Sequence, residues 1–219
     1  MTALGGEIVV VVDVLRFTTA VEAGVAAGLS VYPYRWETGT AEEFAASVGA
    51  RLADGRDPAG ASLSPASLMG LEAGSAVVLP SPNGSSCAVR ASEAGATVVA
   101  GCLRNASSVA RWVSAQGGAV AVIAAGERWP DGTLRPAVED LIGAGAVLAH
   151  LSGSISPEAR MAIAAFEATS DQLPAVLAES ASGRELNGKG WADDLSYAGA
   201  VGASRIVPVM AEGAFRPGA

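Results

Sequence analysis

The sequence predicts an α/β fold, in which a mostly parallel sheet carries flanking helices and the C-terminal third is rich in helix. Two observations lead to this prediction. Over the first 125 residues, short aliphatic runs such as VVVV (9–12) and AVVLP (76–80) alternate with segments of helical periodicity. After residue 130, helical patterns follow one another directly. Short apolar runs between turn signals are typical of buried parallel strands, and the alternation places helices on the faces of the sheet.

Each expected element has a local signal. We expect strands near 8–13, 30–34, 75–80, 97–102 and 119–125, and RIVPVM (205–210) is able to form one more. Helices are expected near 18–28, 41–48, 84–94 and 105–116, then near 138–151, 157–168, 171–181 and 192–200. The expected N-caps are Thr18 or Thr19, Asn83 and Asn105. Two helices are expected to end at Gly95 and Gly117.

The segment between the second and third strands is different in composition. Residues 53–67 are rich in Gly, Ala, Ser and Pro, which predicts a long loop of the kind that is often functional. No repeat and no linker is evident, so we expect one domain over residues 1–219. The chain starts MTALGGE, without the basic region of a signal peptide, and no apolar run approaches the roughly 18 residues of a membrane span. We therefore expect a cytoplasmic protein.

Charge and residue counts exclude several function classes. With 14 basic and 22 acidic residues the net charge is -8, which argues against nucleic acid or a membrane as a partner. Cys87 and Cys102 have neither the spacing of a zinc site nor that of a disulfide framework. His150 is the one histidine, so a Ser-His-Asp triad, a phosphohistidine or a multi-histidine metal site would depend on it alone. A homodimer is possible, given the high apolar content.

Small polar and charged residues follow four of the expected strands. The groups are Asp13, Arg16, Thr18 and Thr19; Ser81, Asn83, Gly84, Ser85 and Ser86; Arg104, Asn105, Ser107 and Ser108; and Glu127, Arg128 and Asp131, with Glu139 and Asp140 beyond them. Helix capping or a solvated loop explains each group singly. Parallel sheets, however, bind ligands beyond the carboxyl ends of their strands, and helix N-termini there bind anions. Together the four groups predict an anion site, with Arg16 and Arg104 able to grip a phosphate or sulfonate.

The acidic residues in these groups indicate a metal ion. Carboxylates beside an anion site would repel the ligand, whereas Mg²⁺ is held by one or two carboxylates together with phosphate oxygens. Asp13, Glu139 and Asp140 are the candidate ligands, and Glu127 is a weaker one. Glu139 and Asp140 are adjacent, so on a helix their side chains diverge by about 100° and one of them is expected to bind.

Several segments resemble one family, the 2-phosphosulfolactate phosphatases, Mg²⁺-dependent enzymes of coenzyme M biosynthesis. DVLRFTTA (13–20) resembles the family's DVLRATT motif, and PNGSSC (82–87) resembles its TNGT turn. The others are GCLRNASSVA (101–110), AAGERW with VEDLIGAGAV (124–147), SASGRELNGKGWADDLSYA (180–198) and SRIVPVM (204–210). They occur in the family's order and extend over most of the chain.

The resemblance implies a phosphomonoester hydrolase of a small 2-hydroxy acid phosphate, such as 2-phospho-3-sulfolactate, with 3-sulfolactate and phosphate as products. Catalysis would rest on Asp13, Arg16 and Glu139, and Mg²⁺ on Asp13 with Glu139 or Asp140. The expected substrate-binding residues are Thr18, Thr19, Asn83, Gly84, Ser85, Asn105 and Arg184. Whether Asp13 is a metal ligand or the nucleophile stays open. The alternative is a non-catalytic relative that binds a phosphorylated or sulfonated metabolite. Its main support is the segment 53–67, which is reduced in comparison with the Gly/Glu-rich stretch of the family.

Overall fold

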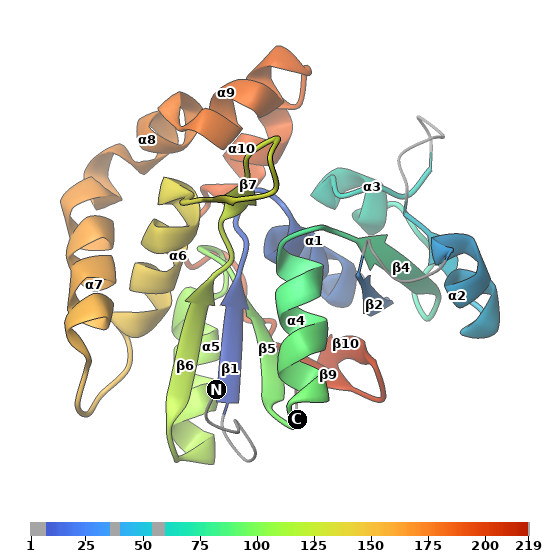
Figure 1. Ribbon diagram of the computed structural model, residues 1–219, viewed down its shortest axis with the longest axis horizontal. Coiled ribbons are helices and arrows are strands. Elements are labelled where there is room, and N and C mark those ends of the chain that lie inside the picture. Colours follow the sequence, from blue (N-terminus) through green and yellow to red (C-terminus); the bar gives the residue numbers. More distant parts are fainter. Residues whose placement is uncertain (1–7, 36–39, 54–59, 219) are drawn as a thin grey trace.

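The structure is a computed structural model that describes residues 8–35, 40–53 and 60–218 (Figure 1). Its strands are β1 (Ile8–Val12), β2 (Ser30–Tyr34), β3 (Arg51–Leu52), β4 (Ala76–Pro80), β5 (Thr97–Gly101), β6 (Val120–Ala124), β7 (Glu127–Arg128), β8 (Leu134–Arg135), β9 (Pro208–Ala211) and β10 (Ala214–Pro217). Its helices are α1 (Phe17–Ala26), α2 (Ala41–Ser47), α3 (Pro65–Met69), α4 (Gly84–Glu93), α5 (Ala106–Gln116), α6 (Val138–Leu148), α7 (Pro157–Thr169), α8 (Leu173–Glu179), α9 (Ala181–Gly188) and α10 (Ala192–Ala198). A 3₁₀ turn, Ser170–Gln172, precedes α8.

An eight-stranded, mostly parallel sheet forms the centre, as the sequence predicts. Its strand order is β3-β4-β2-β10-β9-β5-β1-β6, and β7 pairs with β8 in a separate small sheet. β5, β1 and β6 form one parallel group, and β2, β4 and β3 form another. The β9–β10 hairpin lies between the groups and pairs antiparallel with β5 on one side and β2 on the other. The two parallel groups therefore run in opposite directions.

This arrangement corrects one expectation from the sequence. The polar strand ends were expected along a single parallel edge, but β4 belongs to the opposite group from β1, β5 and β6. The C-terminal hairpin separates the two groups, and the sequence revealed only part of it, at 205–210. The loop after β4 nevertheless reaches the end of β1, because the N-terminus of α4 contacts Asp13.

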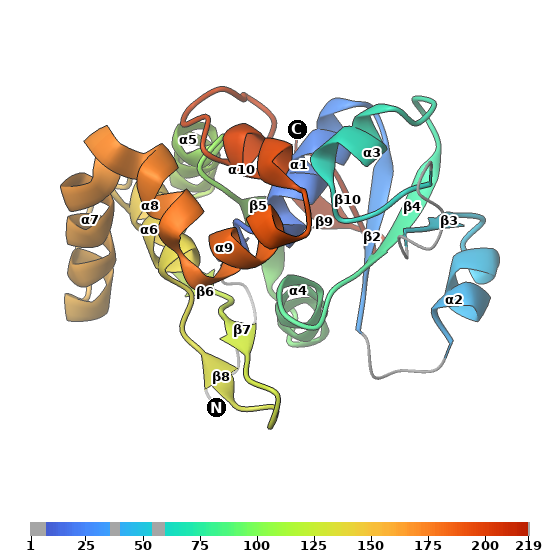
Figure 2. The ribbon, with the colours of Figure 1, turned by 90° about the horizontal axis from the view of Figure 1, so that it is seen from above.

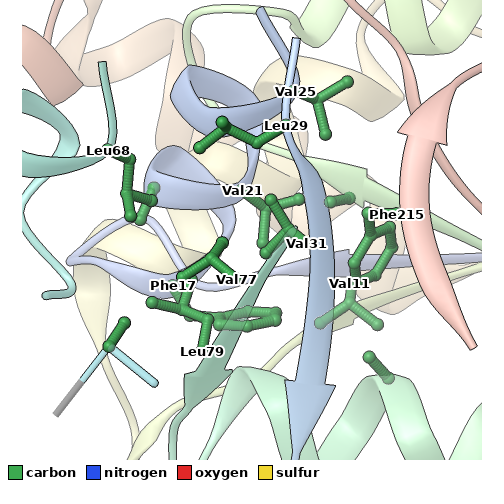
Figure 3. Close-up of a cluster of buried hydrophobic side chains, with 14 of the residues drawn as sticks. Val11, Phe17, Val21, Val25, Leu29, Val31, Leu68, Val77, Leu79 and Phe215 are labelled. Atoms are coloured by element: carbon green, nitrogen blue, oxygen red, sulfur yellow. The ribbon is translucent and has the colours of Figure 1, made fainter. Parts of the chain in front are cut away.

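The side chains of β1 alternate between two hydrophobic cores. Val9 and Val11 join a cluster with residues of α1 and α4, which Figure 3 shows around Phe17. Val10 and Val12 join a second cluster with residues of α5 and α6. All four valines are fully buried. The strand is thus covered on both faces, and this burial fixes the position of the loop that follows it.

The C-terminal helices lie across the carboxyl end of β1. Figure 1 shows α8, α9 and α10 above the ends of β1 and β6, and in Figure 2 α9 and α10 lie between the α6–α8 helices and α1. α6 and α7 pack closely, and a Cβ added at Gly145 would lie 2.6 Å from the carbonyl carbon of Ala162. The helix-rich C-terminal third is therefore confirmed, and it covers one end of the sheet.

Some boundaries differ from the prediction. In the segment expected to be a loop, residues 54–59 lie outside the described part of the chain, while Pro65–Met69 forms α3. The helix expected at 171–181 ends at Glu179, and α9 follows it directly. Thr18 and Thr19 lie inside α1, whose N-cap position is Arg16. Asn83 and Asn105 do occupy N-cap positions, but neither side chain caps its helix.

Among the described residues, no helix combines the length and apolar character that crossing a membrane requires. A single domain, a cytoplasmic location and a homodimer stay predictions.

Candidate active site

Asp13 lies at the carboxyl end of β1, and the backbone fixes both of its carboxylate oxygens. Oδ1 accepts a hydrogen bond from the amide nitrogen of Phe17 (3.1 Å), and Oδ2 accepts one from that of Gly84 (2.9 Å). Thr18 Oγ1 in turn donates to the carbonyl oxygen of Asp13 (2.8 Å) and lies 2.9 Å from its amide nitrogen. The carboxylate is therefore held in one orientation by residues of α1 and by the N-terminus of α4.

Gly84 is required for this close approach. A Cβ at that position would lie 2.7 Å from Oδ2 of Asp13 and 2.9 Å from its Cβ, and would overlap the ring of Phe17. Any side chain at this position would therefore push α4 away from Asp13, and the expected contact of Gly84 with substrate stays a prediction.

Asp13 lines a cavity of about 140 Å³, which we call the Asp13 cavity. Loops after β1, β4 and β6 contribute to it, together with residues of the segment 182–191. Its polar and charged lining residues are Asp13, Arg16, Ser81, Asn83, Glu127, Ser182, Glu185 and Lys189, with Trp191 beside them. The cavity therefore brings together both charge signs and is small enough for a compact ligand.

Arg16 has its guanidinium fixed on two sides. Nη1 donates to Oδ2 of Asp194 over 2.6 Å, and the guanidinium carbon lies 4.1 Å from the centre of the Trp191 ring. Asp194 is buried, and its other oxygen accepts a hydrogen bond from Ser64 Oγ (2.6 Å). α10 and the start of α3 thus orient Arg16 toward the cavity.

Glu127 joins two walls of the site. Its Oε1 accepts hydrogen bonds from Nδ2 of Asn83 (2.6 Å) and from the amide nitrogen of Arg128 (2.8 Å). No described residue donates a hydrogen bond to its Oε2. The residue after β6 is therefore tied to the N-cap of α4 while one carboxylate oxygen stays available.

Four acidic residues form a cluster around the end of β1. Burial raises the pKa of the Asp13 carboxyl to about 6, and repulsion from Glu127 and Glu139 acts in the same direction, against its two backbone hydrogen bonds. Burial and the nearby Asp13 raise the pKa of Asp140 well above its usual value. Bringing these carboxylates together therefore costs free energy while they are ionised.

The two predicted ligands on α6 are placed differently. Asp140 fastens two loops, because Oδ1 accepts from the amide nitrogen of Val14 (2.7 Å) and Oδ2 from that of Gly126 (2.9 Å). Glu139 is equally buried, and no hydrogen bond reaches its carboxylate from the described part of the chain. Of this pair, Glu139 is the one whose oxygens stay free.

A model of the 2-phosphosulpholactate phosphatase family matches residues 2–213 of the 219. The chain belongs to this family. The resemblance inferred from the sequence is thereby confirmed, and so is the enzyme class, because the 2-phosphosulpholactate phosphatases are phosphoric monoester hydrolases.

Phosphatases generally use a divalent metal, and the oxygen donors of this family member fit Mg²⁺. No three His, Cys, Asp or Glu side chains form a metal-binding group among the residues described. Mg²⁺ often needs one or two protein carboxylates, however, and takes its other ligands from water and phosphate. Asp13 and Glu127 line one cavity, and Glu139 is close enough to act on the charge of Asp13. A cation there would offset the repulsion within the acidic cluster.

Several residues that the resemblance assigned to the substrate have other contacts in this family member. Thr19 Oγ1 donates to the carbonyl of Val14 (2.8 Å), and Ser85 Oγ donates to that of Leu79 (2.7 Å). Arg184 is exposed and binds the carbonyl of Glu179. With Thr18, these side chains lie outside the lining of the Asp13 cavity.

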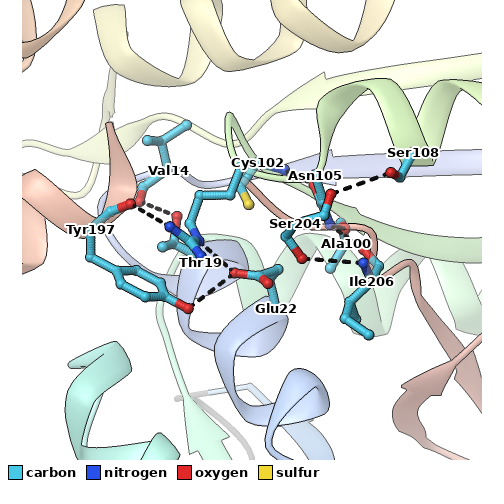
Figure 4. Close-up of polar contacts among 11 residues, drawn as sticks. Val14, Thr19, Glu22, Ala100, Cys102, Asn105, Ser108, Tyr197, Ser204 and Ile206 are labelled. Atoms are coloured by element: carbon cyan, nitrogen blue, oxygen red, sulfur yellow. Dashed lines mark hydrogen bonds and ion pairs between the residues drawn. The ribbon is translucent and has the colours of Figure 1, made fainter. Parts of the chain in front are cut away.

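Asn105 and its neighbour Arg104 also bind within the protein. Figure 4 shows Asn105, whose Oδ1 accepts from the amide nitrogen of Cys102 (2.8 Å) and whose Nδ2 donates to two backbone carbonyls. Arg104 donates from Nε to Oε2 of buried Glu22 (2.9 Å), and its guanidinium carbon lies 3.6 Å from the ring centre of Tyr197. The end of β5 therefore serves to hold the α10 region rather than to line the cavity.

The sequence analysis missed the contribution of α9 and α10. Ser182, Lys189 and Trp191 line the cavity, and Asp194 orients Arg16. The segment 180–198 resembles the family, which is a signal for its role, but within it the resemblance points to Arg184, which is exposed. Without the fold, nothing distinguishes Arg184 from Lys189 as the cation at the cavity.

Proposed function

We propose that this protein is a Mg²⁺-dependent phosphatase of a small 2-hydroxy acid phosphate that carries a further anionic group, such as 2-phospho-3-sulfolactate. The products are 3-sulfolactate and inorganic phosphate. The single observation that carries the proposal is the presence of Asp13 and Arg16 in the lining of one cavity of about 140 Å³. An acidic metal ligand and a phosphate-binding cation are thereby available to the same small ligand.

Arg16 is the main phosphate-binding side chain in this proposal. Its guanidinium is already oriented by Asp194 and Trp191, so little conformational freedom is lost when a phosphate binds. Lys189 adds a second positive charge at the cavity, and Asn83 also lines it. Positive charge placed before the reaction begins stabilises the charge that develops on the phosphate oxygens.

The acidic cluster is the proposed metal site. Asp13 and Glu139 hold Mg²⁺, as the resemblance implies, with Glu127 facing the same cavity. Bound there, Mg²⁺ supplies charge that neutralises the phosphate oxygens and orients the phosphoryl group. Asp140 fixes the positions of the loops after β1 and β6 relative to each other through its two backbone hydrogen bonds. Thr18 and Thr19 bond the loop after β1. Ser85 bonds the end of β4, and Asn105 bonds the segment after β5.

We assign Asp13 to metal binding rather than to nucleophilic attack. Both of its oxygens already accept backbone hydrogen bonds, and the Gly84 backbone lies against Oδ2. A phosphoryl group on either oxygen would displace one of these contacts. Attack by water is therefore favoured. The water oxygen bonds to phosphorus as the ester oxygen leaves, and Glu127 at the cavity is placed to take the proton of the water and to pass a proton to the departing oxygen.

Phosphate release from 2-phospho-3-sulfolactate tests the proposal, measured with Mg²⁺, with EDTA, and with EDTA followed by excess Mg²⁺. We expect release that EDTA abolishes and Mg²⁺ restores, and that Asp13→Asn lacks. An acid-quenched single turnover should contain no phosphorylated protein. Stabilisation by 3-sulfolactate or phosphate without turnover would contradict catalysis and would support a metabolite-binding relative instead.

A further inference from the structure

A second cavity, of about 170 Å³, adjoins the Asp13 cavity, and we call it the arginine cavity. Three arginines from three elements line it: Arg35 after β2, Arg90 on α4 and Arg128 on β7. Among the residues that the structure describes, none of those lining this cavity is acidic. Its remaining lining residues are Pro82, Asn83, Ser86, Cys87, Ala125 and Leu134. A small cavity with this lining has the character of an anion site.

The positive charge there is largely uncompensated. Arg35 lies 3.5 Å from Glu93, whereas neither Arg90 nor Arg128 has a carboxylate within ion-pair distance in the described part of the chain. The protein has 22 acidic and 14 basic residues and is therefore negatively charged overall. A cavity lined by arginines without carboxylate partners, such as Arg90 and Arg128, is unusual in such a protein. Gathering like charges costs free energy unless a ligand of opposite charge binds between them.

The surroundings favour an anion further. Ser86 and Arg90 lie four positions apart on α4 and so face the same side of that helix, Ser86 in its first turn and Arg90 in its last. Nη1 of Arg128 donates to the carbonyl of Gly132 (2.9 Å), which orients the guanidinium and leaves its other N–H groups for a ligand. Both Arg90 and Arg128 also lower the pKa of the nearby Cys87 thiol, although burial, the largest effect, raises it overall.

The two cavities share a wall. Pro82 and Asn83 line both of them. Oε1 of Glu127 holds this wall together, because it accepts from Asn83 on one side and from the backbone of Arg128 on the other. A ligand anchored at Asp13 therefore has the arginine cavity directly beyond this shared wall.

We propose that the arginine cavity binds the second oxyanion of the substrate, a sulfonate or carboxylate that is not cleaved, while the phosphate occupies the Asp13 cavity. This inference rests on the proposed function and assigns the choice of substrate to Arg90 and Arg128. An arginine fork presents paired N–H donors that match an oxyanion. A phosphate ester without that oxyanion binds through the Asp13 cavity alone and is the poorer substrate.

Three substrates and three variants test this assignment. The substrates are 2-phospho-3-sulfolactate, 2-phospholactate, which lacks the sulfonate, and the phosphate ester of 2-hydroxyethanesulfonate, which lacks the carboxylate. The variants are Arg90→Gln and Arg128→Gln, with Arg160→Gln on α7 as the control. Loss of one charged hydrogen-bond donor should raise KM about tenfold for substrates that carry the bound oxyanion. We expect kcat within about twofold of the parent protein and no effect in the control.

The pattern across substrates separates the outcomes. A KM rise confined to the two sulfonates identifies the sulfonate as the bound group, and a rise confined to the two carboxylates identifies the carboxylate. An equal rise for all three substrates would place the phosphate itself near these arginines and overturn the assignment, as would no rise at all. Arg90→Lys, which keeps the charge but loses the fork, should show a smaller effect than Arg90→Gln.

Binding of 3-sulfolactate, measured by calorimetry at fixed ionic strength, keeps the test valid if no turnover is found. Binding that is about tenfold weaker in Arg90→Gln and Arg128→Gln than in Arg160→Gln would support the anion subsite while the catalytic proposal fails. Equal binding by all three variants, or none by the parent protein, would refute the subsite.

Discussion

The amide nitrogen of Gly84 donates a hydrogen bond of 2.9 Å to Oδ2 of Asp13, across 71 positions of the sequence. This contact joins the carboxyl end of β1 to the N-terminus of α4, although the two strands before these loops belong to oppositely directed groups of the sheet. The positive end of the α4 dipole also favours the ionised carboxylate. The geometry of the Asp13 cavity therefore depends on how closely α4 approaches β1.

Gly84→Ala should damage both stability and activity. The added Cβ would lie 2.7 Å from Oδ2 of Asp13, so either α4 or the Asp13 loop must move. Overpacking of this kind costs about 2 kcal/mol in the free energy of unfolding. We expect kcat/KM for phosphate release to fall at least about tenfold, since displacement of the Asp13 carboxylate weakens both metal and substrate binding.

Gly188→Ala is the matched control for this substitution. Gly188 is the last residue of α9, and a Cβ there would meet no atom within 4 Å. Urea unfolding and kinetic measurements should therefore distinguish the two variants, with the losses of stability and of kcat/KM confined to Gly84→Ala. Equal effects of the two substitutions, or a fully active Gly84→Ala protein, would contradict the steric role of Gly84.

Asp194→Ala should release Arg16 from its position. The substitution leaves the mostly buried guanidinium without its carboxylate partner at 2.6 Å, which costs about 3 kcal/mol of stability. Trp191 still contacts the guanidinium, so we expect a rise of about tenfold in KM rather than complete loss of turnover. The exposed neighbour Asp193 supplies the control, and Asp193→Ala should behave as the parent protein does in both measurements.

The β1–α1 unit was readable from the sequence because its signals are local. Five aliphatic residues, one acid and a helical pattern follow one another within residues 8–26, and both elements form nearly where expected. Polar residues after β1, β4 and β6 line one cavity, whereas those after β5, which were expected with them, bond elsewhere within the protein. Burial of β1 on both faces determines where its loop lies, and an uninterrupted apolar run is the direct sequence signature of such burial.

The partners of Arg16 were not readable because they depend on tertiary structure. Asp194 lies 178 positions away, in a segment whose two adjacent aspartates look alike in sequence. Only the packing of α10 over the end of β1 buries one of them and exposes the other. The β9–β10 hairpin presents the same difficulty, since four-residue strands have almost no periodic signal and their insertion between two parallel groups is a property of the whole sheet.

Arg104→Met should affect stability without affecting substrate recognition. Its guanidinium pairs with Glu22, which is almost completely buried, and removal of the arginine leaves that carboxylate unpaired. We expect a loss of about 3 kcal/mol in urea unfolding. At a temperature where the variant is folded, KM and kcat should match the parent values. A large rise in KM would contradict this prediction and would indicate that Arg104 binds the phosphate.

The pH dependence of stability should reveal the titration of Asp13. Its pKa of about 6 lies above the unfolded value of 3.8, so the folded protein holds this proton more tightly. As pH rises from 3.8 through about 6, the free energy of unfolding therefore falls, and the loss is complete above that range. Between pH 5 and pH 8, without metal, we expect the unfolding free energy of the parent protein to fall by roughly 1.4 kcal/mol relative to that of Asp13→Asn. A difference between the two proteins that is the same at both pH values would contradict this prediction.

Mg²⁺ should reverse the loss of unfolding free energy that the ionisation of Asp13 causes at high pH. Above pH 6 the ionised Asp13 is repelled by Glu127 and Glu139, and a bound cation removes this repulsion. Differential scanning fluorimetry at pH 8 should therefore show a rise in Tm with Mg²⁺ that EDTA cancels, and the rise should be smaller at pH 5 because protons compete for the carboxylates. Asp13→Asn should lack the response, whereas Asp171→Asn, at an exposed position in the 3₁₀ turn, should keep it. An equal Mg²⁺ response in the two variants would mean that the ion acts elsewhere on this acidic protein, so the difference between them locates the metal site independently of any assay of turnover.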